Sequence, residues 1–135
     1  MNGGLSVIDG MKRTLFGFWL FTVCVCTAAA QVDSQILVQA SPLAGFQFYA
    51  GKAVWKQLHE GDGLTLVRER DNAHDDNAIR VEWHGQQLGY VPRRDNAALA
   101  RLMDKGAVMD ARIVRLNVSR NPWRRIEFEV YETLH

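Results

Sequence analysis

Apolar and polar residues alternate along most of the chain that follows residue 35. A period of two residues places successive side chains on opposite faces of an extended backbone, so each alternating segment predicts a half-buried β-strand. Five segments show the pattern most clearly: 64–70, 78–83, 87–91, 108–118 and 126–131. A sixth β-prone run, 36–40, is interrupted by Ser41 and Pro42.

Turn and helix signals separate these strands. His84, Gly85 and Gln86 form a tight connection, which makes 79–91 a predicted hairpin. After Pro92 the apolar period changes to that of a helix over 96–105, with Asp95 as its N-terminal cap and Gly106 at its C-terminal end. A shorter helix is predicted over 52–59.

The segment around residue 48 carries aromatic side chains at adjacent positions. Phe46, Phe48 and Tyr49 would lie on both faces of an extended segment, which favours a strand edge or a binding rim. The whole pattern, five or six short strands with one firm helix, is mainly β and fits a small closed or partly closed β-barrel. Its core is expected to include Leu66, Ile79, Val81, Leu88, Leu99 and Leu102.

The N-terminus has the three parts of a secretory signal. Lys12 and Arg13 precede the uncharged run 15–26, and 28–30 supply small residues for cleavage before Gln31. We therefore predict a signal peptide over 1–30, a linker over 31–35 and a domain over 36–135, with an exported, periplasmic or secreted product. An uncleaved anchor and a buried helix remain as alternatives, and Met11 is a possible start.

Removing this signal changes the composition of the chain. The whole sequence has 16 basic and 15 acidic residues, of which Lys12, Arg13 and Asp9 lie in the predicted signal, so the remainder is formally neutral. A neutral chain argues against strong nonspecific binding of polyanions. Cys24 and Cys26 also leave with the signal, and no disulfide or thiolate ligand is expected in the mature protein.

The densest polar cluster, 71–77, favours a loop whose Asx side chains cap their own backbone. A calcium loop is a poor fit, since Ala73 stands at the third position and Asp76 at the sixth. The scattered histidines show no zinc spacing. No serine, threonine or tyrosine stands in a nucleophile context, and adjacent carboxylates such as Asp75 and Asp76 would point apart. We predict neither enzyme activity, nor a metal, nor a cofactor.

The order of the motifs is more informative than any one of them. FQFYAG (46–51), GDGLTLVRE (61–69), NAHDDNAIRV (72–81), GQQLGYVPR (85–93) and NAALARLMDKG (96–106) follow one another in register. This series resembles the HIRAN domain over roughly 36–116, and the match is most specific over 68–93. The resemblance implies a modified OB-like β-barrel, alone or fused to helicase-like and nuclease modules, that binds the free 3′ end of single-stranded DNA.

The resemblance also implies a binding site. Phe48 and Tyr49 would flank or stack on terminal bases, Asp75 would accept the terminal 3′ hydroxyl, and Arg93 would meet a phosphate. His74 and Tyr90 would complete the site, at positions where some family members carry tyrosine and histidine. Gln47 stands where some carry arginine, which makes the expected site less positively charged.

Two functions remain open at this point. The first is a non-catalytic, monomeric module that holds a single-stranded nucleic-acid end. The second is an exported OB-like adaptor that binds a protein, peptide or glycan on the same rim, and it draws on the export signal and the neutral charge. Neither needs a membrane after cleavage, and a shared fold alone does not decide between them.

Overall fold

Six antiparallel strands form one sheet in the computed structural model, which describes residues 29 and 33–135. The predicted signal peptide lies outside these residues apart from Ala29, as do Gln31 and Val32 of the predicted linker. The strands are β1 (Ser34–Pro42), β2 (Gly63–Arg68), β3 (Ile79–Trp83), β4 (Gln86–Tyr90), β5 (Met109–Leu116) and β6 (Ile126–Leu134). The mainly β prediction is confirmed.

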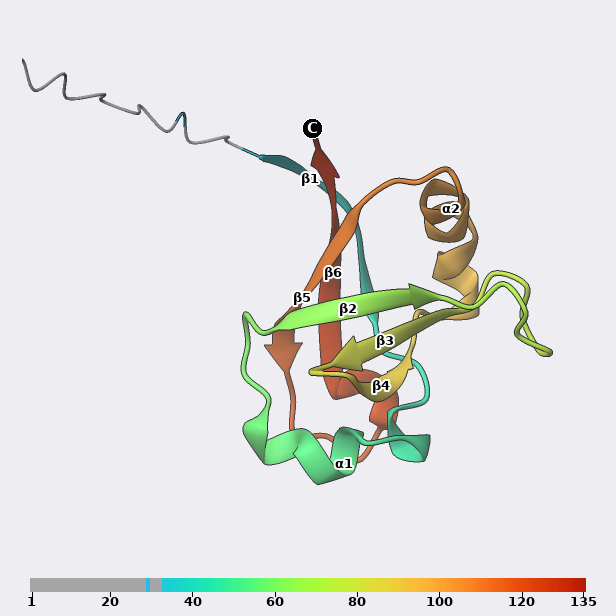
Figure 1. Ribbon diagram of the computed structural model, residues 1–135. Helices are drawn as coiled ribbons and strands as arrows, with labels where there is room; N and C mark the ends of the chain where they lie inside the picture. Colours follow the sequence, from blue (N-terminus) through green and yellow to red (C-terminus); the bar gives the residue numbers. More distant parts are fainter. Residues whose placement is uncertain (1–28, 30–32) are drawn as a thin grey trace, which may run out of the picture. The chain divides into compact units, whose positions relative to one another are not determined.

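The sheet has the order β1-β6-β5-β2-β3-β4 and curves back on itself. Figure 1 shows β2 and β3 crossing in front of β5 and β6 at a steep angle. The segment after β1 then meets β4, because the backbone amides of Ala44 and Tyr90 each donate to the other residue's carbonyl at 2.9 Å. This single residue pair joins the two ends of the sheet and closes the barrel.

Irregular register lets the strands bend this sharply. The pairing shifts between Leu37 and Gln39 in β1, between Val81 and Glu82 in β3, and between Ile113 and Arg115 in β5. An extra residue on one strand of a pair increases the local twist, which is how small barrels turn their corners.

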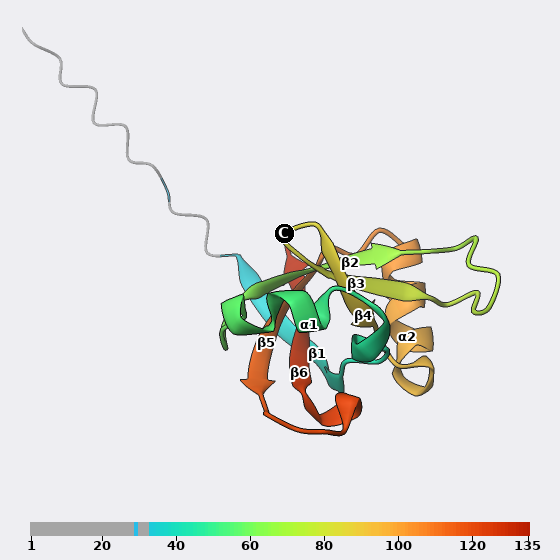
Figure 2. The same cartoon turned by 90° about the horizontal axis from the view of Figure 1, so that it is seen from below.

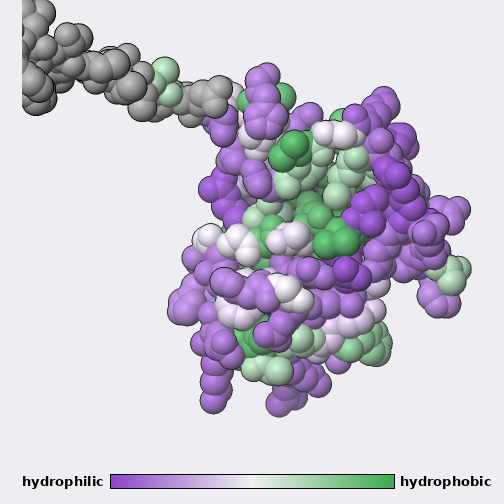
Figure 3. All heavy atoms as spheres, viewed as in Figure 1, coloured by the Kyte–Doolittle hydropathy of each residue, from purple (hydrophilic) through white to green (hydrophobic). Residues whose placement is uncertain are grey.

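The predicted alternation is seen in the burial of β3 and β6, whose inward side chains fill the barrel. The core includes the expected Ile79, Val81, Leu88 and Leu99, whereas Leu66 and Leu102 are only partly buried. Ile113, Ile126, Phe128 and Val130 complete its centre. The face seen in Figure 3 is mostly hydrophilic, with apolar surface showing above β2, between the β5–β6 pair and α2.

Two α-helices accompany the sheet in the described part of the chain. The first, α1 (Gly51–Val54), continues into the 3-10 turn η2 (Trp55–Gln57) and lies across one end of the barrel (Figure 2). The second, α2 (Arg93–Asp104), ends as predicted: Gly106 has φ +89°, and the amides of Gly106 and Ala107 donate back to Met103 and Leu102. Among the described residues no helix combines the length and apolar character needed to cross a membrane.

The predicted start of α2 was wrong. The helix begins at Arg93 rather than Asn96, with Pro92 at its cap position, and Asp95 lies inside the first turn without capping it. The fixed φ of proline suits a helix start, and the carbonyl oxygen of Pro92 accepts from the amide of Asp95 at 2.9 Å. Because of this, Arg93 and Arg94 belong to the helix and are held in place by it.

Two other expectations at the N-terminal side were also wrong. Residues 46–48 form a 3-10 turn, η1 (Phe46–Phe48), instead of an extended segment, and only Phe46 of its aromatics is buried. Strand β1 starts at Ser34 and runs through Pro42, since pairing with the long β6 extends it at both ends. As an edge strand it tolerates proline.

Candidate nucleic-acid interface

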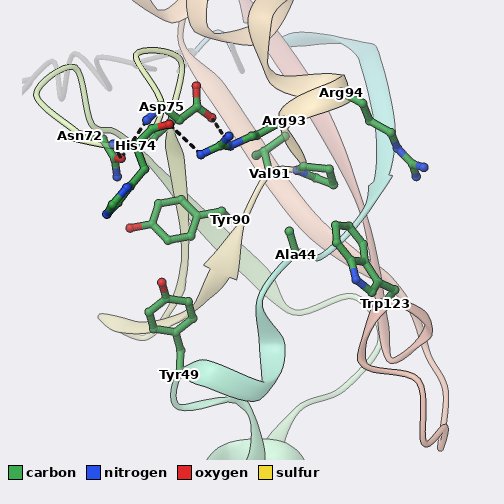
Figure 4. A pocket seen from close by; sticks show the side chains of 12 residues that line it. Ala44, Tyr49, Asn72, His74, Asp75, Tyr90, Val91, Arg93, Arg94 and Trp123 are labelled. Atoms are coloured by element: carbon green, nitrogen blue, oxygen red, sulfur yellow. Dashed lines mark hydrogen bonds and ion pairs between the residues drawn. The ribbon is translucent and has the colours of Figure 1, made fainter.

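An open hollow of about 520 Å³ lies where the sheet closes on itself, beside the start of α2. It collects side chains from four stretches of the chain: the 44–49 turn, the 71–78 loop, the end of β4 with the first turn of α2, and the β5–β6 connection. Its lining residues are Ala44, Tyr49, Asn72, His74, Asp75, Ala78, Tyr90, Val91, Pro92, Arg93, Arg94 and Trp123 (Figure 4).

Five of the six predicted site residues line this hollow: Tyr49, His74, Asp75, Tyr90 and Arg93. Phe48 does not. Its ring is 75% exposed on the neighbouring surface, whereas Tyr49 packs edge-on against Tyr90 with ring centroids 5.8 Å apart. Both members of the aromatic pair are thus accessible, but only Tyr49 faces the hollow.

The 71–77 loop keeps its shape through its own Asx side chains, as predicted. Asn72 Oδ1 accepts from the backbone amides of His74 and Asp75, and Asp75 Oδ1 accepts from the amide of Asn77. These bonds hold the conformation of the loop. Within 33–135 and at residue 29, no cluster of His, Cys, Asp and Glu side chains could hold a metal ion.

Asp75 is the carboxylate at the back of the hollow, and its side chain is 19% exposed. Its Oδ2 accepts from Nδ2 of the buried Asn96 at 2.7 Å and lies 3.9 Å from Arg93 Nε. A carboxylate oxygen can accept more than one hydrogen bond, so Oδ2 keeps room for a donor from a ligand. Asp76 is exposed, so the two adjacent carboxylates do not share a site.

A second carboxylate, Glu69, supports the wall of the hollow from behind. It accepts from Tyr90 Oη at 2.8 Å, from Asn72 Nδ2 at 3.0 Å and from Arg80 Nη1 at 2.8 Å. Burial alone would raise the pKa of Glu69, but these donors outweigh it and hold the pKa below its ordinary value. Burial and the bond to Glu69 raise the pKa of Tyr90, so its hydroxyl stays protonated as the donor.

This arrangement predicts acid sensitivity. Because the pKa of Glu69 is lower in the folded state, its stabilising contribution is complete above its ordinary value and disappears as the pH falls through the lowered one. We expect Glu69→Gln to cost about 1–2 kcal/mol of unfolding free energy at pH 7 and less at pH 3. Urea unfolding of both proteins at the two pH values measures this, and an equal cost at both would contradict it.

The cations of the hollow come from the first turn of α2. Arg93 Nη2 donates to the carbonyl oxygen of His74 at 2.6 Å, yet its side chain remains 71% exposed. Arg94 is 70% exposed, and within the described part of the chain its guanidinium hydrogen-bonds only to Asp95 Oδ2, at 3.4 Å. Both guanidinium groups are therefore exposed enough to meet an anionic ligand at the mouth of the hollow.

Trp123 forms the wall opposite the two tyrosines, across a floor that includes Ala44 and Val91 (Figure 4). Its ring is 47% exposed, and it lies in the 3-10 turn η3 (Pro122–Arg124), where Asn121 Oδ1 accepts from its amide. Three lining residues were not predicted as site residues from the sequence: Asn72, Arg94 and, in this connection between two strands, Trp123. A tryptophan inside a turn signal is the feature that could have drawn attention to it.

The combined features of the barrel and its hollow define a class of protein. A small β-barrel with an open hollow, aromatic walls, one carboxylate and two exposed guanidinium groups is a binding module. The chain matches the family model described as HIRAN domain over residues 36–135. The chain belongs to the HIRAN domain family, whose domain is a DNA-binding module.

Known proteins agree with this assignment. A Fanconi-associated nuclease 1 homolog of Oryza sativa subsp. japonica is 43% identical over 53 residues, which is 36% of this chain and 6% of that protein. An Arabidopsis thaliana protein described as a SWI/SNF-related matrix-associated actin-dependent regulator of chromatin, subfamily A member 3-like 1, is 30% identical over 111 residues, covering 76% of this chain and 12% of its own length. The chain thus spans a small part of either relative.

Solved structures share the fold. A crystal structure of a protein from Lactobacillus plantarum has a TM-score of 0.67 and 26% identity, covering 76% of this chain and 99% of its own. The HIRAN domain of human HLTF has a TM-score of 0.54 and 21% identity, with 73% and 77% coverage, and shows the fold alone.

Proposed function

We propose that this protein is a non-catalytic module that holds the 3′ end of single-stranded DNA in the hollow beside α2. The observation that carries the proposal is the convergence of Tyr49, His74, Asp75, Tyr90 and Arg93, which are scattered over 45 positions of sequence, on one open hollow with a further exposed aromatic wall. Membership of a DNA-binding family supports the same ligand.

The chemistry of each wall suits one part of a strand end. The faces of Tyr49 and Trp123 offer stacking surfaces that accept any base. Asp75 Oδ2 can accept a hydrogen bond from a terminal 3′ hydroxyl, and it would repel a terminal phosphate. Arg93 and Arg94 stand at the opening, where the backbone phosphates of the last nucleotides would pass.

Few cations take part, so binding should depend only moderately on salt. Each neutralised phosphate of a single strand contributes a slope of about 0.7 in a plot of log affinity against log salt concentration. Fluorescence anisotropy of the purified protein with a labelled single strand at several salt concentrations tests the proposal. Binding with a slope of about 1–3 supports it. If the protein binds no single strand at low salt, DNA is excluded as the ligand, and the alternative of an adaptor that binds a protein, peptide or glycan on the same rim is left.

We also propose that the protein is exported, on the strength of the charged, apolar and small-residue parts of 12–30. Intact-mass analysis of protein recovered from a Gram-negative periplasm is expected to show a species that begins at Gln31. A full-length product in the membrane pellet would contradict cleavage at this site.

A further inference from the structure

A second hollow, of about 370 Å³, lies between the outer edge of β1 and the exposed face of α2. Its lining is Gln39, Ala40, Ser41, Arg94, Asp95, Ala97, Ala98 and Arg101. Arg94 lines both hollows, and in Figure 4 its side chain extends away from Arg93 beside β1. The two hollows therefore meet at one guanidinium group.

Helix geometry aligns the cations of the second hollow. Arg94 and Arg101 are seven residues apart, which is two turns or about 10.5 Å along the same face of α2. Between them lie Ala97 and Ala98, whose small side chains leave the helix surface open to close approach. Arg101 is exposed and has no ion pair within the described part of the chain.

The carboxylate in this hollow is already engaged. Asp95 Oδ2 accepts from Arg94 Nε and from the hydroxyl of the buried Ser41, both at 3.4 Å. Ser41 also accepts from Gln39 Nε2 at 3.0 Å. These contacts turn Asp95 toward β1 and leave the arginines as the groups that an anion would meet along the helix.

We propose that the second hollow is the continuation of the DNA path: the strand that ends beside Asp75 passes Arg94 and runs 5′-ward along α2, with an upstream phosphate at Arg101. This inference rests on the proposed function. In this arrangement Arg94 lies where the site for the strand end meets the site for the upstream backbone. The arrangement also fixes the polarity of the strand, whose 3′ end points toward the 71–77 loop.

The size of the first hollow supports a continuation. Single-strand-binding barrels of this general type contact roughly 4–16 nucleotides. A hollow of about 520 Å³ is of the size that binds a small-molecule ligand, so it accommodates only the end of a strand. The remaining contacts have to lie along a neighbouring surface, and the β1–α2 hollow adjoins the first and carries the complementary charge.

The test compares strand lengths. With oligothymidylates of about 3, 6 and 10 nucleotides carrying a 3′ hydroxyl, affinity for the full protein is expected to rise with length and then level off. Arg101→Gln should weaken binding of the longest strand about five- to tenfold at 50 mM salt and lower its salt slope by about 0.7. It should leave the shortest strand and the preference for a 3′ hydroxyl unchanged.

Lys56→Gln is the matched control, because it removes one exposed charge from η2, outside both hollows. An Arg101→Gln protein that binds every length like the wild type, or a Lys56→Gln protein that loses as much affinity for the longest strand as Arg101→Gln does, would overturn the continuation while leaving end binding intact. If the wild-type protein binds no strand of any length, the proposed function itself is contradicted.

Discussion

Replacing Gly89 by alanine is expected to lower the unfolding free energy by about 3 kcal/mol or more. A Cβ at this position would stand 2.2 Å from the carbonyl oxygen of Ala44 and 3.0 Å from Leu43 Cγ. Neither neighbour can yield, since the Ala44 carbonyl accepts the amide of Tyr90 and Leu43 is buried. The substitution would therefore force apart the bridge that closes the barrel.

Gly63→Ala is the natural control. No atom lies within 4 Å of a Cβ built there, and Gly63 also lies in a strand. Its effect on chemical denaturation should stay within about 0.5 kcal/mol. A loss for Gly89→Ala as small as this would mean that the Ala44–Tyr90 contact opens readily. The floor of the hollow would then be a weaker constraint than its two hydrogen bonds indicate.

An oligonucleotide that ends in a 3′ hydroxyl should bind better than the same strand ending in a 3′ phosphate, by about 1–3 kcal/mol. The reason is the half-buried Asp75 carboxylate, which can accept from a hydroxyl but repels a phosphate. Asp75→Ala is expected to abolish this preference. Anisotropy titrations with the two strands measure it directly.

Asp75 also supports the 71–77 loop, so its replacement affects the structure as well as ligand binding. Its oxygens accept from the amide of Asn77 and from Asn96, so alanine leaves the buried Asn96 without its partner. Asp75→Asn retains an acceptor for the loop while removing the charge, and Asp76→Ala removes a neighbouring exposed carboxylate as a control. Equal affinity of the wild-type protein for both end types would exclude end recognition by Asp75.

The sequence predicted the central hairpin well because its signals are local. Side-chain alternation fixes which residues of β3 face inward, and the two residues between the strands, His84 and Gly85, both have positive φ, as a two-residue hairpin turn requires. The same local logic located the end of α2 at Gly106. Only the connection was expected to be one residue longer, since Gln86 already belongs to β4.

The parts that sequence reasoning missed depend on contacts between distant segments. Trp123 reaches the hollow only because β5 and β6 pair in one particular register, and no periodicity in 117–125 carries that information. The turn at 46–48 looked like a strand because its aromatics alternate. It is a 3-10 turn because Phe46 is buried against Gly51 and Trp55.

Apart from the single Ala44–Tyr90 bridge, the closed sheet has its shortest register between β2 and β5. Their register contains only two residue pairs, Gly63 with Arg112 and Leu64 with Ala111, whereas β1 and β6 pair along almost their full length. Hydrogen exchange should therefore divide the protein into two cooperative units, with β1, β5 and β6 in one and the β2–β4 meander in the other. The hollow is lined by residues from both units. A ligand bound in the hollow should therefore slow amide exchange at the β2–β5 pairing, although the ligand does not touch that pairing.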